Sequence, residues 1–339
     1  MGNQRKTALT AVAVMASALS VAAMHDWENP AVNSRNRMPA ATYAMPLADE
    51  KVALSDALEF DTPWKMSLNG EWKFRWSGDP ARRPFHFWKG EYNVSGWETI
   101  DVPSCVELRG YGMPHYIAHG YPHKFAWPKI LDKETGRPDY NPVLSYRRKF
   151  AVPDGWRGRE TILRFEGVAS AFYVWINGRE VGYAEDSKLP SEFNITEFLK
   201  GGENDIAVQV FRWCDGSYVE DQDMLRFSGI FRDVSLWSRP KAGIADFAIT
   251  EKFGERYKSA AVDVAVETYG NAKEVSVTLY DAQFKEVANG KTKTAASNSQ
   301  LSTLNFQLSS PILWSAERPL SGLVSWRFTP LNFTGLPFT

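Results

Sequence analysis

The most oxygen-rich part of the chain is a short polar segment directly after a predicted strand. Four carboxylates fall within nine consecutive positions, at Asp215, Glu220, Asp221 and Asp223. Carboxylate oxygens suit hard cations and the hydroxyl groups of polyols. The spacing differs from that of an EF-hand loop, and no histidine lies nearby in the sequence. The segment is therefore a candidate cation or polyol site, and the alternative is a charged loop satisfied by its own arginines and backbone.

Aromatic side chains are the second notable feature. They make up 14% of the chain, and the 13 Trp among them exceed what a soluble protein of this size usually carries. Flat rings stack on the apolar faces of sugars, although tryptophan also fills the interior of large sandwiches. Several rings fall in the Pro- and Gly-rich stretch 103–142, which has few strand runs and is typical of binding loops.

The elements that must position these residues are predicted to be β-strands. Alternating or apolar runs cover 146–152, 161–165, 171–176 and 205–213. Asn177-Gly178 predicts a type I′ hairpin turn, because that turn needs positive φ at both central residues. Closely spaced strands with almost no helical pattern between them indicate a sandwich or jelly roll.

A second domain is predicted beyond Arg239-Pro240. The runs 261–267, 274–280 and 303–308 alternate cleanly and are separated by polar turns, as in an immunoglobulin-like sandwich without its disulfide. After Trp314 the pattern fades among prolines and glycines. We therefore expect an all-β chain with a jelly-roll sandwich over 61–239 and an immunoglobulin-like sandwich over 240–339, the latter incomplete at its C-terminal end.

The N-terminal segment has the pattern of an export signal. A short basic start is followed by an uncharged run ending in Val21-Ala22-Ala23, so residues 1–23 are predicted to form a cleaved signal peptide rather than an uncleaved anchor. The irregular segment 24–60 is predicted to be an extended arm on the domain surface. The protein is accordingly expected to be periplasmic or secreted, without a membrane span.

The charge and the cysteines exclude several classes of partner. A formal net charge of −1 offers no basic surface for nucleic acid or an anionic membrane. The two cysteines, Cys105 and Cys214, have no metal-binding spacing and are interpreted as buried small hydrophobes, with a single bridge between them left open.

A set of ordered motifs gives the chain a resemblance to a known family. The matching segments are Asn29-Pro30, Leu68-Asn-Gly-Glu-Trp72, Val102-Pro-Ser104, Trp175-Ile-Asn-Gly178, Val181-Gly-Tyr183, Leu189-Pro-Ser-Glu-Phe193, Gly202-Glu-Asn204, Asp215 to Met224, Ser228 to Val234 and Leu313-Trp-Ser-Ala-Glu317. Together they resemble the sugar-binding domain of glycoside hydrolase family 2, and specifically that of the large bacterial β-galactosidases. The resemblance covers roughly residues 29 to 319.

The resemblance implies roles for individual residues. It gives Asp215 the role of reaching into the active-site pocket, where it helps hold the galactosyl unit and a sodium ion. It also implies magnesium as a further cation of the full-length family. A family loop carries a substrate-binding Asn in the setting Tyr-Thr-Asn-x-x-Tyr-Pro, and the stretch here reads Tyr116-Ile-Ala-His-Gly-Tyr-Pro122. Ala118 cannot replace that amide, so His119 becomes the second substrate-binding candidate, the alternative being an ordinary solvated loop histidine.

No catalytic residue is assigned. A retaining glycosidase needs two carboxyl groups about 5–5.5 Å apart, and by resemblance the family carries them on a (β/α)₈ barrel of about 250 residues. Only 99 residues follow Pro240, and none of them has an alternating strand and helix pattern. Glu220 and Asp223 are close in sequence but have no evident means of separating their pKa values. The chain is therefore expected to be inactive alone and to be a truncated product.

Three functional hypotheses remain open from the sequence. The first is a β-galactosidase by family that lacks its catalytic domain. The second is a stand-alone exported protein that binds a galactoside or another glycan. The third is a fragment that associates with a separate catalytic polypeptide or forms a homo-oligomer.

Overall fold

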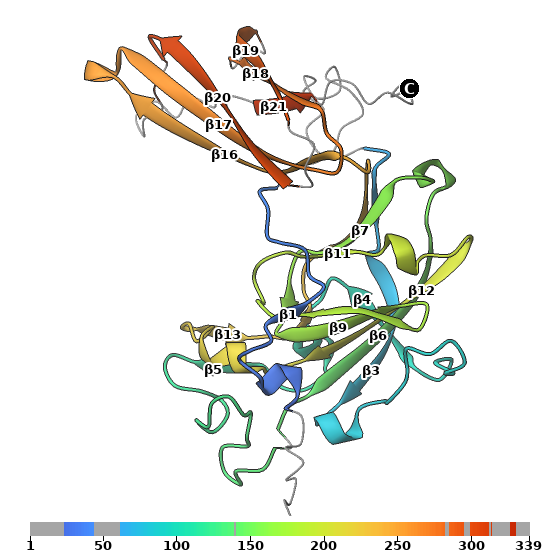
Figure 1. The fold of residues 1–339 in the computed structure, drawn as a ribbon. Helices are drawn as coiled ribbons and strands as arrows, with labels where there is room; N and C mark the ends of the chain where they lie inside the picture. The colour runs from blue at the N-terminus through green and yellow to red at the C-terminus, as the bar shows by residue number, and fades with distance from the viewer. Residues whose placement is uncertain are drawn as a thin grey trace, which may run out of the picture.

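The computed structural model describes residues 24–43, 62–138, 140–281, 285–294, 299–311, 313 and 326–329. Within these ranges the regular elements are β-strands and short 3-10 helices, with no α-helix. The strands form two β-sandwiches in series (Figure 1). The prediction of an all-β chain is confirmed.

The larger sheet of the first sandwich has seven strands in the order β1-β10-β9-β12-β6-β3-β4. All neighbouring strands are antiparallel. The strands are β1 (Ser34–Arg35), β3 (Gly70–Ser77), β4 (Glu98–Val102), β6 (Val143–Ala151), β9 (Ala171–Ile176), β10 (Arg179–Ala184) and β12 (Glu203–Phe211).

The opposing sheet has four strands in the order β11-β7-β15-β2. These are β2 (Lys65–Ser67), β7 (Glu160–Phe165), β11 (Ser191–Asn194) and β15 (Val234–Arg239). Alternation along the strands sends one set of side chains between the sheets, as with Trp72 and Phe74 of β3, which are fully buried. These rings pack with Leu163, Phe165 and Val208 in one contiguous core.

The predicted Asn177-Gly178 turn is present between β9 and β10. Asn177 has φ of 52° and Gly178 has φ of 82°, so both central residues have the positive φ that a type I′ turn demands. The Asn177 side chain also donates to the side-chain carbonyl of Asn204 at 2.8 Å. This link ties the hairpin tip to β12, the strand that leads to the carboxylate segment.

The N-terminal arm joins the first sandwich rather than only covering it. It contains the 3-10 helix η1 (Asp26–Glu28) and the short strand β1, which pairs with β10. Trp27 is buried and stacks on Phe211 with ring centroids 3.9 Å apart. Asp26 accepts hydrogen bonds from Arg35 at 2.6 Å and from the Tyr173 hydroxyl at 2.7 Å.

The second sandwich places two three-stranded sheets around a smaller core. One has the order β16-β17-β20, and the other has the order β19-β18-β21. The buried residues between them include Val264, Val277 and Phe306. The strands are β16 (Gly243–Phe253), β17 (Ser259–Tyr269), β18 (Glu274–Tyr280), β19 (Glu286–Lys293), β20 (Ser299–Ser309) and β21 (Trp326–Thr329).

Some sequence predictions fall outside the described residues. These are the signal peptide over 1–23, most of the arm after Tyr43, and most of the chain after Trp314. In the described part, no helix is long and apolar enough to cross a membrane. Cys105 and Cys214 are both free thiols; Cys214 is buried as predicted, whereas Cys105 is only half-buried.

Candidate functional site

Asp215 begins a 3-10 helix at the end of the first sandwich. This helix, η6 (Asp215–Tyr218), follows β12 after only three residues. The Cys214 N–H donates to the Ser217 hydroxyl at 3.0 Å, and the Ser217 N–H donates back to the Cys214 carbonyl at 2.9 Å. This reciprocal cap fixes the first residue of the helix, and therefore the Asp215 side chain, against a rigid strand.

The Asp215 carboxylate is buried and only half satisfied. Asp215 is 4% exposed, and its Oδ1 accepts a hydrogen bond from the Gly216 N–H at 2.9 Å. Its Oδ2 accepts no hydrogen bond from any N–H or hydroxyl group of the described residues. A buried carboxylate oxygen without a donor is costly, so it is well suited to receive a ligand hydroxyl or a cation.

Glu185 is the nearest carboxyl group to Asp215. Ligand atoms of Glu185, Cys214 and Asp215 lie within 4.8 Å of one another, and all three residues are buried. The Tyr183 hydroxyl donates to Glu185 Oε1 at 2.5 Å. Sequence reasoning missed Glu185, although it lies between two segments of the family resemblance and directly extends β10.

Burial controls the protonation of this pair. It raises the pKa of the Glu185 carboxyl to about 8, with the charge of Asp215 adding to the shift and the Tyr183 hydroxyl opposing it. Burial also raises the pKa of Asp215, which a hydrogen bond from Glu185 lowers in part. At neutral pH the Glu185 carboxyl is therefore largely protonated and can donate to Asp215. Burial thus favours the protonated form of both carboxyl groups, and the shift is large enough to carry a value only for Glu185.

The other three carboxylates of the segment do not join Asp215. Glu220 accepts from the Ser187 N–H at 2.7 Å and from the Ser187 hydroxyl at 2.5 Å. Asp221 accepts from Arg226 at 2.5 Å, and Asp223 is exposed. The structure thus favours the alternative of a self-satisfied charged loop for Glu220 and Asp221, and it leaves Asp215 as the candidate ligand-binding carboxylate.

Exposed apolar side chains surround the same end of the sandwich. The two-stranded ribbon of β5 (His115–Ile117) and β13 (Met224–Arg226) pairs Tyr116 with Leu225, and both side chains are exposed. The loop after β5 exposes Phe125 and Trp127 as well, at 71% and 54%. We call Tyr116, Leu225, Phe125 and Trp127 the aromatic rim. Large exposed apolar side chains are candidates for contact with a ligand or a partner.

His119 lies in the loop that follows β5 and is exposed. No hydrogen bond or ring contact joins its side chain to another described residue, Asp215 included. The structure therefore places both predicted substrate-binding residues in segments next to the β5–β13 ribbon without bringing them into contact.

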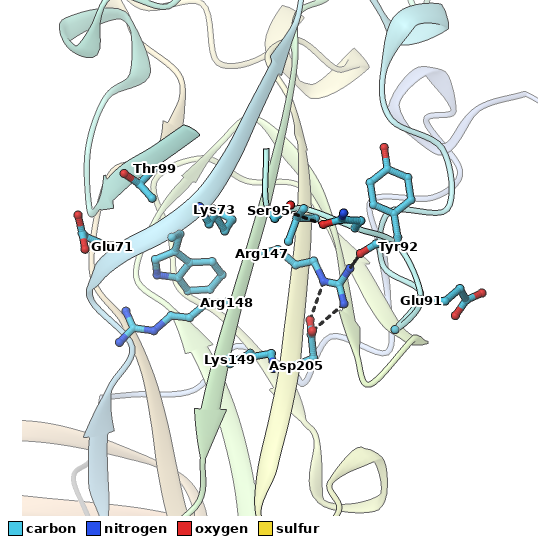
Figure 2. Close-up of a pocket in the computed structure, with 14 residues that line it drawn as sticks. Glu71, Lys73, Glu91, Tyr92, Ser95, Thr99, Arg147, Arg148, Lys149 and Asp205 are labelled. Atoms are coloured by element: carbon cyan, nitrogen blue, oxygen red, sulfur yellow. Dashed lines mark hydrogen bonds and ion pairs between the residues drawn. The ribbon is translucent and has the colours of Figure 1, made fainter. Parts of the chain in front are cut away.

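A groove beside β3 and β6 of the seven-stranded sheet is lined by residues with a structural role. It measures about 900 Å³ and is lined by charged and polar residues of β3, β6 and the 90–95 loop (Figure 2). Arg147 dominates it, donating to both oxygens of Asp205 at 2.9 and 2.6 Å and to the carbonyls of Phe87, Lys89 and Tyr92. The donors of Arg147 are thus engaged by protein groups, and the residue serves to hold the loop that contains these carbonyls against the sheet.

Comparison with known proteins identifies the family. The sugar-binding domain of glycosyl hydrolases family 2 matches residues 65–240, and a second model of glycosyl hydrolases family 2 matches residues 242–320. The chain belongs to glycosyl hydrolases family 2. The two matched regions meet between β15 and β16, where the first sandwich gives way to the second.

One curated relative of this family 2 chain is a beta-galactosidase of Priestia megaterium. The two are 37% identical over 303 residues, which cover 87% of this chain and 29% of the relative. The chain thus spans less than a third of the relative's length.

Solved structures of similar fold include beta-glucuronidases. The beta-glucuronidase 2 of Bacteroides uniformis superposes with a TM-score of 0.59 at 22% identity, covering 75% of this chain and 29% of that one. The beta-glucuronidase of Bifidobacterium dentium superposes with a TM-score of 0.56 at 20% identity, and the match covers 77% of this chain and 44% of that one. At these identities the likeness shows the fold.

Proposed function

We propose that this family 2 chain forms the sugar-binding wall of a β-galactosidase-type enzyme that hydrolyses terminal β-galactosides in carbohydrate catabolism. The observation that carries the proposal is the buried Asp215 carboxylate with its unpartnered Oδ2. A buried carboxylate oxygen that accepts from no N–H or alcohol hydroxyl group of the described residues can accept a hydrogen bond from a sugar hydroxyl and so select for that hydroxyl's position. The beta-galactosidase of Priestia megaterium supports the substrate class.

In this proposal the chain binds and orients the sugar, and other residues carry out hydrolysis. Retaining hydrolysis needs an acid/base carboxyl and a nucleophilic carboxylate about 5–5.5 Å apart. Glu185 and Asp215 are close enough, but both are buried and share one hydrogen bond. We therefore place the acid/base and the nucleophile in the part of the relative that this chain does not match, either in the same polypeptide or in a separate catalytic one.

A cation fits the Asp215 site in part. Hard cations such as sodium take oxygen ligands, and Asp215 Oδ2 is available, whereas the neighbouring Cys214 thiol is a poor ligand for sodium. Asp215 would thus be the described residue that holds sodium, which would neutralise the carboxylate and orient the sugar hydroxyls. No described cluster presents the oxygen set that magnesium prefers, so magnesium remains an expectation for the wider protein.

Location and assembly complete the proposal. We place the protein in the periplasm or outside the cell, where β-galactosides arrive before uptake. The aromatic rim is proposed to contact the sugar and a separate catalytic polypeptide or a second copy of the chain, because exposed apolar surface of this kind favours burial.

A complementation experiment tests the proposal. The purified chain is mixed with a family 2 catalytic polypeptide that lacks its own N-terminal domains, and hydrolysis of a chromogenic β-galactoside is followed. We expect turnover only in the mixture, and an Asp215→Asn loss of about 30- to 100-fold in kcat/KM, because a charge-assisted hydrogen bond is replaced. Asp223→Asn, an exposed change in the same segment, is the matched control. Robust turnover by the chain alone, or equal activity of both variants, would contradict the proposal.

A second candidate function is a stand-alone exported carbohydrate-binding protein, which the exposed Phe125 and Trp127 favour. Calorimetry of the chain alone against galactosides and larger glycans distinguishes the two. Saturable glycan binding that Trp127→Ala abolishes, together with failure of the complementation experiment, would favour this second function.

A further inference from the structure

Unsatisfied polar atoms concentrate around one small cavity. Among the described residues, eight buried side-chain nitrogen and oxygen atoms lack a hydrogen-bond partner. Five of them belong to His123, Arg212, Trp213 and Arg226, and all four of these residues line the same cavity of about 40 Å³ beside η6. We call this space the His123 cavity. Because native proteins rarely leave buried donors unpaired, the clustering points to an occupant.

The occupant must be rich in acceptors. Arg212 Nε, Arg226 Nε and Trp213 Nε1 are N–H donors without partners, and neutral His123 adds one donor and one acceptor. Burial lowers the pKa of His123 to about 4, so the ring is neutral at physiological pH. Four donors against one acceptor are poorly matched by a single water, which accepts only two hydrogen bonds.

The charged residues of the lining are largely paired with one another. Arg226 forms an ion pair with Asp221 at 2.5 Å, and the buried Arg212 forms one with the buried Glu107 at 3.5 Å. Glu220 accepts a hydrogen bond from the Ser187 hydroxyl. The cavity therefore offers an anion its unpaired N–H donors, held on two arginines and a tryptophan, rather than a net positive charge.

The size of the cavity limits the ligand to an ion. A volume of about 40 Å³ is far below the several hundred Å³ of a small-molecule pocket, and it admits one small ion or a few waters. We propose that the His123 cavity binds one small monovalent anion of the halide class. Ser217 of η6 also lines the cavity, so the bound anion stabilises the helix that begins with Asp215.

The test uses the purified chain and chloride as the probe. Thermal unfolding is measured in sodium chloride and in sodium methanesulfonate at equal ionic strength, the latter anion being too large for the cavity. We expect Tm to rise by about 3 °C or more for each tenfold increase in chloride above its Kd, and to stay flat in methanesulfonate. Equal behaviour in the two salts would overturn the proposal.

Two tryptophan variants separate the site from general salt effects. Trp213→Phe removes a cavity N–H, and we expect it to raise the chloride Kd obtained from the Tm series at least tenfold. Trp64→Phe is the matched control, because its N–H also lacks a partner but its ring packs under Arg159, at 3.7 Å, outside the cavity lining. If Trp213→Phe retains the wild-type response, the proposal fails.

A direct measurement keeps the proposal testable if Trp213→Phe does not fold. Crystals of the wild-type chain grown in sodium bromide are expected to show anomalous density for one bromide between Trp213 and the two arginines. Only water in the cavity would overturn the proposal. These outcomes are independent of galactoside binding, so failure here leaves the proposed function untouched.

Discussion

Glu185 and Asp215 hold their carboxyl groups side by side, within 4.8 Å, although β10 and η6 bring them from positions thirty residues apart. Neither side chain has a lysine or arginine among the interactions that shift its pKa. Burial therefore favours the protonated form of Glu185, which can donate to Asp215, and Glu185 acts as the positioning residue for the Asp215 carboxyl group.

The first prediction concerns pH. The pKa of Glu185 is about 8 in the folded chain against 4.5 in the unfolded one, so the folded state binds the extra proton between these values. The free energy of unfolding should consequently fall as pH rises from about 4.5 to 8, by at most about 1.4 kcal/mol per pH unit. Urea unfolding of Glu185→Gln in sodium-free buffer should show a flatter slope. Glu91→Gln, an exposed control, should keep the wild-type slope, and an unchanged slope in Glu185→Gln would refute the raised pKa of Glu185.

The second prediction concerns the loop anchored by Arg147 (Figure 2). Arg147→Ala leaves Asp205 without its bidentate partner and three loop carbonyls without a donor. We expect a loss of about 3–5 kcal/mol in the free energy of unfolding, seen as a Tm lower by roughly 10 °C. The neighbouring Lys149→Ala breaks only an exposed pair with Glu203 and should change Tm far less. Equal losses for the two variants would be inconsistent with this anchoring role.

The third prediction concerns close packing of the N-terminal arm. A Cβ at Gly182 would overlap the Arg35 carbonyl oxygen and would approach the Phe193 ring to 2.8 Å. Gly182→Ala should therefore displace β1 and cost about 1–3 kcal/mol. Gly201, which has no atom within 4 Å of the added methyl, supplies the control. Hydrogen exchange of the β1 amides should accelerate in Gly182→Ala and stay unchanged in Gly201→Ala.

The fourth prediction concerns the aromatic rim. Replacing Tyr116 and Leu225 together by Ser should leave the stability of the chain within about 0.5 kcal/mol per site, since both side chains are exposed. In the complementation assay the same change should weaken association with the catalytic polypeptide by about 10- to 100-fold. Phe253→Ser alters an equally exposed ring in β16 of the second sandwich and should have no effect. Unimpaired complementation by the double variant would show that the rim is not a contact surface.

Local signals in the sequence were sufficient for much of the fold. The Asn177-Gly178 turn and the alternation of Trp72 and Phe74 depend on neighbours in the chain, and the structure confirms both. The strand β1 was not predicted, because two residues carry no periodic pattern and Ser34 pairs with Ala184, which is 150 positions away.

The candidate site was predicted only in part, because its contacts also join residues that are far apart in the sequence. Asp215 was recognised from its motif, but the sequence could not distinguish it from Glu220 and Asp221 by environment. The hydrogen bonds that satisfy Glu220 and Asp221 come from Ser187 and Arg226, whose positions follow from tertiary packing. Glu185 was missed because a single acidic residue after a strand gives no signal until the fold places it beside another carboxylate.

The stack of Trp27 on Phe211 gives the predicted signal-peptide cleavage a structural consequence. Phe211 ends the strand that delivers Asp215, and Trp27 lies only four positions beyond the predicted signal-peptidase site at Ala23. Cleavage at Ala23 leaves this ring in place, whereas trimming by a few more residues removes it and exposes Phe211. If the predicted cleavage takes place, proteolytic trimming beyond Trp27 would remove the ring that covers the end of β12, the strand that leads to Asp215.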